Sequence, residues 1–321
     1  MPSRTIKKRK MRFDRLAAAV FLLAIIIFLL YLFIQLLTTP SGKTEKPVAS
    51  NEKPDSAVST STHLEFEKQF FKYEDIYSGY LILVNDNHMY SVPSEQESMA
   101  SIDEVKNDYY SIKNVNMLMD TLALKNFNSM LSGFYQQYSD KSIMITEALV
   151  TAERQNVIYN QALENSMHMS KGGYSEHQTG LAVDLAICSE SDGIYKYSAT
   201  GNYTWFRDNC TQYGFIRRYP DSKTDKTGII NHEEHFRYVG IPHAYYMAEN
   251  DLSLEEYLQE LKKYSYGSKT LNVSCYSNEY EIYYIRAKYD MTDNVDVYVP
   301  RNNKYTISGN NIDGFIITVE K

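Results

Sequence analysis

Two short stretches of the sequence hold residues whose types and spacing could do chemistry. Residues 175–184 read SEHQTGLAVD, and residues 235–240 read HFRYVG. They supply imidazoles from His177 and His235 and a carboxylate from Asp184. Two imidazoles and a carboxylate are a common ligand set for catalytic zinc, with the fourth coordination position left to water. The metal would lower the pKa of that water towards neutrality and make it a nucleophile.

The spacing alone is a weak signal, because an isolated histidine is more often a hydrogen-bonded structural residue than a metal ligand. His177 and Asp184 are close in sequence, so a turn or a pair of strands would bring them together. Gly180 permits such a bend. The role of Ser175 stays open between contact with a substrate and the capping of a turn.

The sequence and order of the motifs make the prediction of a metal site stronger than the spacing alone does. SEHQTGLAVDL reads almost letter for letter like the first zinc motif of the VanY-type D,D-carboxypeptidases, and HFRYVG resembles their second motif. The segment between them also has that family's texture, with Trp205, YGFI at 213–216, RYP at 218–220, Lys223 and TGI at 227–229. The resemblance spans roughly residues 79–261 of the chain.

This resemblance implies zinc ligands at His177, Asp184 and His235. It implies an α+β fold, with a small antiparallel sheet and flanking helices around the Zn(II) site. The substrates it implies are peptidoglycan stem peptides or precursors, from which the family removes the terminal D-Ala.

The first departure from the family lies at the general base. The family usually has Glu-Pro-Trp-His, where the Glu moves a proton from water to the leaving amine. The same register here reads His232, Glu233, Glu234, His235, so His232 occupies the position of the base. Side chains alternate along a strand, so Glu233 would share a face with His235 and is a better substitute than Glu234. A neutral His232 could also act as the base or bind the metal.

The second departure concerns an arginine that assists binding and charge stabilisation in the family. Val150 occupies its position, and Arg154, one helical turn further on, is the candidate to compensate. Three hypotheses remain. The first is a zinc D,D-carboxypeptidase in which Ser175 and Arg154 hold the substrate. The second is a catalytically degenerate relative that binds zinc and wall peptide or a partner protein, and the third is a metal-free structural wall protein.

The elements before the zinc motifs predict a membrane anchor. The first fifteen residues hold seven cations against one anion. Residues 16–37 form an apolar run long enough for a transmembrane helix, and the basic flank stays in the cytoplasm. Residues 38–63 are polar and rich in Pro and Ser, which is typical of a flexible linker. We therefore expect a single-pass protein of the cell membrane with an extracytoplasmic C-terminal domain, and no nucleic-acid partner for the basic tail.

The rest of the chain divides into two predicted parts. Residues 64–266 contain a predicted buried strand at 80–84 and helices over 115–135, 151–163 and 252–264, the last opened by a capping box of Ser253 and Glu256. Residues 267–321 alternate apolar and polar residues between Gly, Asn and Asp, which predicts a small all-β region. It could bind wall polymer or only pack on the zinc domain. The three cysteines are interpreted as buried hydrophobes, although a Cys188–Cys210 bridge is compatible with the sequence.

Overall fold

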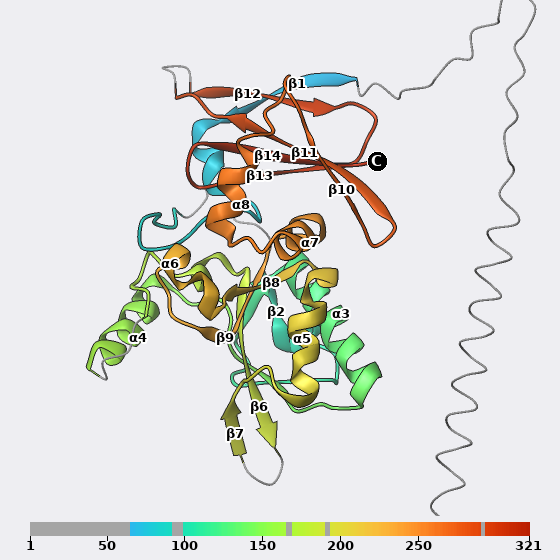
Figure 1. Cartoon of the computed structure of the whole chain (residues 1–321). Helices are drawn as coiled ribbons and strands as arrows, with labels where there is room; N and C mark the ends of the chain where they lie inside the picture. The colour runs from blue at the N-terminus through green and yellow to red at the C-terminus, as the bar shows by residue number, and fades with distance from the viewer. Residues whose placement is uncertain (1–64, 92–98, 165–168, 190–192, 290–292) are drawn as a thin grey trace, which may run out of the picture. The chain divides into compact units, whose positions relative to one another are not determined.

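The computed structural model describes residues 65–91, 99–164, 169–189, 193–289 and 293–321, which all belong to one compact unit, Thr62–Lys321. This unit is an α+β fold built on small sheets, as predicted (Figure 1). Among the described residues, no helix is both long enough and apolar enough to cross a bilayer. The predicted basic tail, transmembrane span 16–37 and linker 38–63 lie outside the described residues and stay predictions.

The sheet that carries the zinc motifs has the strand order β3–β5–β6–β9–β8, with β7 paired to β6. Its pairings are antiparallel except that of β3 with β5. The strands are β3 (Ser111–Ile112), β5 (Ile143–Glu147), β6 (Ala182–Ser189), β7 (Gly193–Lys196), β8 (Phe215–Tyr219) and β9 (His232–Tyr238).

Helix α3 (Thr121–Tyr138) covers this sheet. Its buried residues recur every three or four positions, so one apolar stripe faces the core. Asp120 caps the helix by accepting a hydrogen bond from the amide of Ala123 at 2.8 Å. The helix begins later than the predicted 115–135 because Leu118–Asp120 form β4, which pairs with β2 (Met99–Ser101). The shorter helices beside this layer are α2 (Ile102–Val105), α4 (Ala152–Glu164), α5 (Thr204–Asn209) and α6 (Thr224–Thr227).

A second sheet has the order β10–β11–β14–β13 and is formed by the predicted all-β region (Figure 1). Helices α7 (Ile241–Glu249) and α8 (Leu254–Leu261) share a hydrophobic core with it. The predicted capping box of Ser253 and Glu256 opens α8. The strands are β10 (Leu271–Cys275), β11 (Asn278–Arg286), β13 (Tyr305–Gly309) and β14 (Gly314–Glu320).

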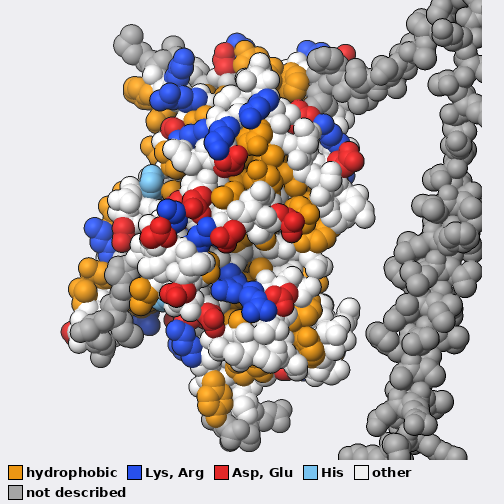
Figure 2. Space-filling model, viewed as in Figure 1, with side chains coloured by type: hydrophobic (Ala, Val, Ile, Leu, Met, Phe, Trp, Pro, Cys, Tyr) orange, Lys and Arg blue, Asp and Glu red, His pale blue; other side chains and the backbone are white. Residues whose placement is uncertain are grey.

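Strand pairing joins segments that the sequence placed in different domains. β1 (Phe66–Lys72) pairs along its whole length with β12 (Asn294–Pro300), so the first described strand lies against the C-terminal region. Figure 2 shows basic and acidic side chains interspersed over one face of the molecule. Ion pairs of the described residues include Lys262 with Asp313 at 2.7 Å. The three cysteines are free, and Cys210 and Cys275 are buried.

Residues 81–84 are buried as predicted and Tyr80 is half-buried, but residues 80–84 do not form the predicted strand. The amide of Leu83 donates to Asn310, while the carbonyls of Tyr80 and Ile82 accept hydrogen bonds from Arg237. A guanidinium group therefore satisfies backbone groups that a neighbouring strand would satisfy in a sheet.

Candidate metal centre and its surroundings

The pairing of two neighbouring strands brings two of the predicted ligands together. Asp184 on β6 is directly opposite His235 on β9. The third ligand, His177, lies in a short 3-10 helix, Glu176–Thr179, which ends at Gly180 with a φ of 71°. That left-handed conformation suits glycine. A Cβ at Gly180 would also lie 2.7 Å from Sδ of Met99, so a side chain in the turn that presents His177 would have to displace the end of Met99.

The three side chains meet at one point. Oδ2 of Asp184 lies 3.1 Å from Nε2 of His177, and Oδ1 lies 2.8 Å from Nδ1 of His235. One ligand atom from each residue falls within 4.8 Å of the others. Tetrahedral zinc with bonds of about 2.0–2.1 Å needs ligand atoms roughly 3.3 Å apart, which is close to these spacings. The donor set therefore fits the predicted metal.

The outer nitrogen of each imidazole is fixed by an acceptor. Nδ1 of His177 lies 2.9 Å from the carbonyl oxygen of Ala148, which can only accept, so Nδ1 carries the proton and Nε2 is free to bind a metal. Nε2 of His235 lies 3.4 Å from Oε2 of Glu176. Such outer partners orient metal-binding histidines and fix their tautomers.

The carboxylates and imidazoles of this cluster stabilise each other's charged forms in the metal-free protein. Burial alone would raise the pKa of Asp184, but the imidazoles of His177 and His235 hold it well below its usual range. Burial would lower the pKa of His235, but Asp184 and Glu176 raise it to about 9. A proton thus occupies the cluster in the metal-free protein, and metal binding would displace it.

Glu176 is the centre of a buried charge network that the sequence analysis did not single out. Its Oε1 accepts a hydrogen bond from Nε of Arg218 at 2.8 Å and lies 3.0 Å from Nη1 of Arg237, an ion pair without hydrogen-bond alignment. Arg218 in turn donates to both carboxylate oxygens of Glu255. Arg218 and Arg237 lie among apolar residues on β8 and β9. Charged side chains are rarely buried without a partner, so this sequence pattern indicates buried carboxylates nearby.

The three base candidates take different positions. His232 lines the pocket around the predicted ligands, whereas Glu233 and Glu234 do not. The carboxylate of Glu233 accepts hydrogen bonds from Oγ of Ser198 and the amide of Ala199, at 3.2 and 3.1 Å. Glu234 pairs with Lys196 at 3.1 Å. The structure therefore does not bring either glutamate to the gap between the ligands.

A bulge explains why Glu233 does not share the face of His235. Arg217 pairs with Phe236, but Tyr219 pairs with His232, so β9 contains extra residues between its paired positions. This irregularity overrides the simple alternation and turns His232 towards the metal pocket. Burial lowers the pKa of His232, and the nearby Glu234 opposes the shift.

The substrate-contact candidates also differ. Ser175 lines the metal pocket, is only 6% exposed, and forms no side-chain cap on the following 3-10 helix. Arg154 is exposed on α4 and does not line the pocket. None of the described residues that line this pocket is a lysine or arginine.

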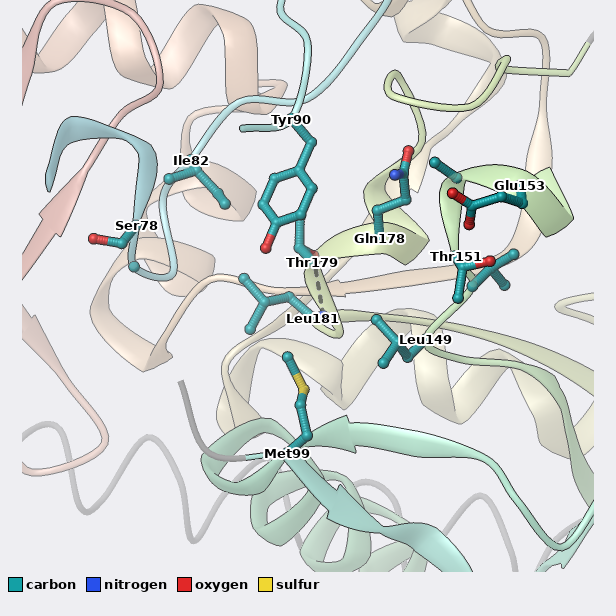
Figure 3. A pocket seen from close by; sticks show the side chains of 13 residues that line it. Ser78, Ile82, Tyr90, Met99, Leu149, Thr151, Glu153, Gln178, Thr179 and Leu181 are labelled. Atoms are coloured by element: carbon teal, nitrogen blue, oxygen red, sulfur yellow. Dashed lines mark hydrogen bonds between the residues drawn. The ribbon is translucent and has the colours of Figure 1, made fainter. Parts of the chain in front are cut away.

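A separate cavity of about 290 Å³ lies beside the metal pocket and includes Val150 in its wall (Figure 3). Figure 3 shows the ring of Tyr90 reaching into it, with Gln178 and Glu153 on one side and Ile82 on the other. Val150 donates its amide to the carbonyl of His177, so the two spaces are separated by the segment that supports a metal ligand.

Comparison with known proteins agrees with this geometry. The family described as VanY, D-alanyl-D-alanine carboxypeptidase, matches residues 110–241. A D-alanyl-D-alanine carboxypeptidase of Enterococcus faecium is 32% identical over 305 residues, which cover 93% of this chain and 95% of the relative. The bifunctional D-Ala-D-Ala dipeptidase and carboxypeptidase VanXYC of Enterococcus gallinarum is 34% identical over 129 residues, or 37% of this chain and 67% of the relative.

A solved structure extends the likeness to three dimensions. The D,D-dipeptidase VanXYg, crystallised with a D-Ala-D-Ala phosphinate analogue, has a TM-score of 0.70 and 30% identity, covering 80% of this chain and 100% of that one. The fold and the relatives together define the class of D-Ala-D-Ala peptidases. Within that class, the chain belongs to the VanY family of D-alanyl-D-alanine carboxypeptidases.

Proposed function

We propose that the chain is a zinc-dependent D,D-carboxypeptidase that removes the terminal D-Ala from peptidoglycan stem peptides. The observation that carries this proposal is the convergence of His177, Asp184 and His235 on one point in a buried pocket. Likeness over almost the whole length of a D-alanyl-D-alanine carboxypeptidase supports the substrate class.

The residues of the pocket suggest how the work is divided. Zinc, when bound, would polarise the scissile carbonyl and activate a water molecule. His232 would accept a proton from the attacking water and return it to the leaving amine as the C–N bond breaks. Ser175 lines the same pocket, and its hydroxyl would orient the peptide by hydrogen bonding. Water is consumed, and the products are free D-Ala and a peptide one residue shorter.

The same geometry predicts slow turnover. A positioned general acid–base is worth about 100- to 10,000-fold in rate, and here an imidazole stands where the family usually has a carboxylate. The pocket's described lining also lacks a cation to stabilise developing negative charge.

A second candidate function is peptide binding without turnover. The specific observation in its favour is that Glu233 and Glu234 are both engaged away from the pocket, by Ser198, Ala199 and Lys196. In that case the zinc ligands would be retained to shape a binding pocket for the D-Ala-D-Ala end.

Measurement of D-Ala release distinguishes the two functions. The purified zinc-loaded chain is incubated with pentapeptide muropeptides, and free D-Ala is quantified over time. Release that is abolished by a chelator and depressed by His232→Gln supports the enzyme. Stoichiometric zinc and saturable peptide binding with no release on any stem peptide would replace the enzyme by the binding protein.

We also propose that residues 16–37 anchor the chain in the cell membrane, with the basic tail in the cytoplasm and the zinc domain outside. The apolar run and its basic flank support this topology. Protease added to intact cells should digest the C-terminal domain and spare an epitope placed on the first residues. Protection of both ends would refute the orientation.

A further inference from the structure

The side chain of Glu176 is buried completely although it carries a charge. Burying an unpaired carboxylate is costly, so a buried one needs cationic partners with hydrogen-bonding geometry. Arg218 meets this need by donating to Oε1 at 2.8 Å, and Arg237 adds a second positive charge 3.0 Å from the same oxygen without hydrogen-bond alignment. Both arginines engage the same oxygen, which leaves Oε2 for another partner.

That partner is the metal ligand His235. Oε2 lies 3.4 Å from Nε2 of His235, on the long side for a hydrogen bond. The other ring nitrogen, Nδ1, faces Asp184 at 2.8 Å. Ionised carboxylates can only accept, so in the metal-free chain each ring nitrogen of His235 holds a proton. A metal that displaces the proton on Nδ1 leaves Nε2–H bound to Glu176.

We propose that Glu176 is a positioning residue that holds His235 by Nε2–H and thereby directs Nδ1 to the metal, while the two arginines keep Glu176 ionised and fixed. The inference rests on the metal site of the proposed function, but not on turnover. It explains why a buried carboxylate lies immediately before the ligand His177 and yet contacts the other histidine.

The supports of Glu176 extend well beyond the metal pocket. Arg218 donates to Glu255 at the first turn of α8, and Asn85 donates to the same carboxylate at 3.2 Å. Arg237 donates to the carbonyls of Tyr80 and Ile82. Each arginine thus has a second partner besides Glu176, at the start of α8 for Arg218 and in the segment of residues 80–82 for Arg237.

The test compares zinc affinity in Glu176→Gln and Glu255→Gln, each in the full chain, by competition with a chromophoric chelator. Both changes remove one buried negative charge that pairs with Arg218, but only the first alters the contact with His235. We expect Glu176→Gln to weaken zinc binding by about 10- to 100-fold, the usual effect of such outer partners, and Glu255→Gln to change it little. Thermal unfolding establishes that both variants are folded.

A second variant and a second measurement keep the test decisive if Glu176→Gln alone does not fold. Glu176→Gln with Arg237→Met removes one anion and one cation together, which keeps the buried charge balanced, and should show the same loss of zinc affinity. Nitrogen-15 NMR of the zinc-loaded chain reports the Nε2–H group of His235 directly, and its resonance should move when Glu176 is changed and stay in place when Glu255 is changed.

Equal zinc affinities for Glu176→Gln and Glu255→Gln, with an unchanged Nε2–H resonance of His235, would overturn the proposal. Zinc affinity and ring NMR do not depend on D-Ala release. If Glu176→Gln binds zinc more weakly than Glu255→Gln, but the unmodified chain releases no D-Ala, the proposed function is contradicted and the role of Glu176 is supported.

Discussion

Nδ1 of His235 lies 2.8 Å from Oδ1 of Asp184, and the two residues are directly paired across β9 and β6. The register of one antiparallel strand pair therefore sets the distance between two metal ligands. A slip of one residue would turn one of the two side chains to the opposite face of the sheet. Strand pairing, and not a loop, therefore places Asp184 and His235 for metal binding.

Replacing Asp184 by Asn should remove the carboxylate that both imidazoles contact. We expect a larger loss of zinc affinity than the roughly 10- to 100-fold typical of outer partners, because a direct ligand is lost. Zinc content after dialysis and calorimetric titration measure it. Asp208→Asn, at a carboxylate that is 54% exposed, is the control and should keep full zinc content. Normal zinc binding by Asp184→Asn would place the metal elsewhere.

Replacing His232 by Glu should raise the rate of D-Ala release. The residue lines the metal pocket, so a carboxylate there could transfer a proton between water and the leaving amine. The expected gain in kcat is on the order of 100-fold, measured with a pentapeptide muropeptide.

The matched control for that change is Glu233→Gln. Its carboxylate is held by Ser198 and Ala199, so the rate should stay the same. A fall in rate with Glu233→Gln, and none with changes at His232, would return the role of base to Glu233.

The sequence predicted the α+β class and the start of α8, because both depend on local patterns of residue type. Its resemblance to a known family pointed to His177, Asp184 and His235, which the structure brings together. The sequence failed for Glu233, since the bulge in β9 depends on how this strand pairs with β8, and local residue patterns do not record that pairing. It also failed for residues 80–84, whose apolar composition indicates burial but not which group binds the backbone. There the partner is the guanidinium of Arg237, contributed from about 155 residues away.

The contact between Glu176 and His235 was missed for a related reason. Glu176 is next to His177 in sequence, but its carboxylate contacts His235 on β9, because the 3-10 helix turns the side chain in that direction. Two arginines among apolar residues at Arg218 and Arg237 were the available sign that a carboxylate is buried between the strands.

Replacing Arg237 by Met should destabilise the fold strongly. The side chain is fully buried, pairs with Glu176 and donates to the carbonyls of Tyr80 and Ile82. Removing one partner of a buried ion pair costs about 3–5 kcal/mol. Urea unfolding in the presence of a chelator measures the change without a contribution from metal binding. Arg301→Met, at a 56% exposed side chain, should leave the free energy of unfolding nearly unchanged.

His243 should make the folded state sensitive to acid. Its ring nitrogens lie 2.7 Å from the hydroxyl of Tyr257 and 2.9 Å from that of Thr318, and burial lowers its pKa to about 3. In the unfolded chain the pKa of His243 is near 6.5, so below that pH its ring binds a proton that it does not bind in the folded chain. Stability is therefore complete above about pH 6.5 and falls as the pH decreases towards 3, by about 2 kcal/mol at pH 5.

The measurement is urea unfolding at pH 7 and pH 5 for the native chain and for His243→Gln. The variant is less stable at both values, because it disturbs buried hydrogen bonds, but it should lose less stability between them. Equal losses in the two proteins would show that His243 is not the group responsible.

Gly180 provides a test of the turn that presents His177. Alanine there would hold a left-handed backbone conformation, at a cost of about 1–2 kcal/mol, and its Cβ would collide with Sδ of Met99 at 2.7 Å. Gly228 has nearly the same φ, 73°, but nothing lies within 4 Å of its would-be Cβ, so Gly228→Ala carries the backbone strain alone. Zinc affinity and the free energy of unfolding should both fall in Gly180→Ala, whereas Gly228→Ala should lose only stability, and less of it. If the two variants bound zinc equally well, the turn would not control the placement of His177.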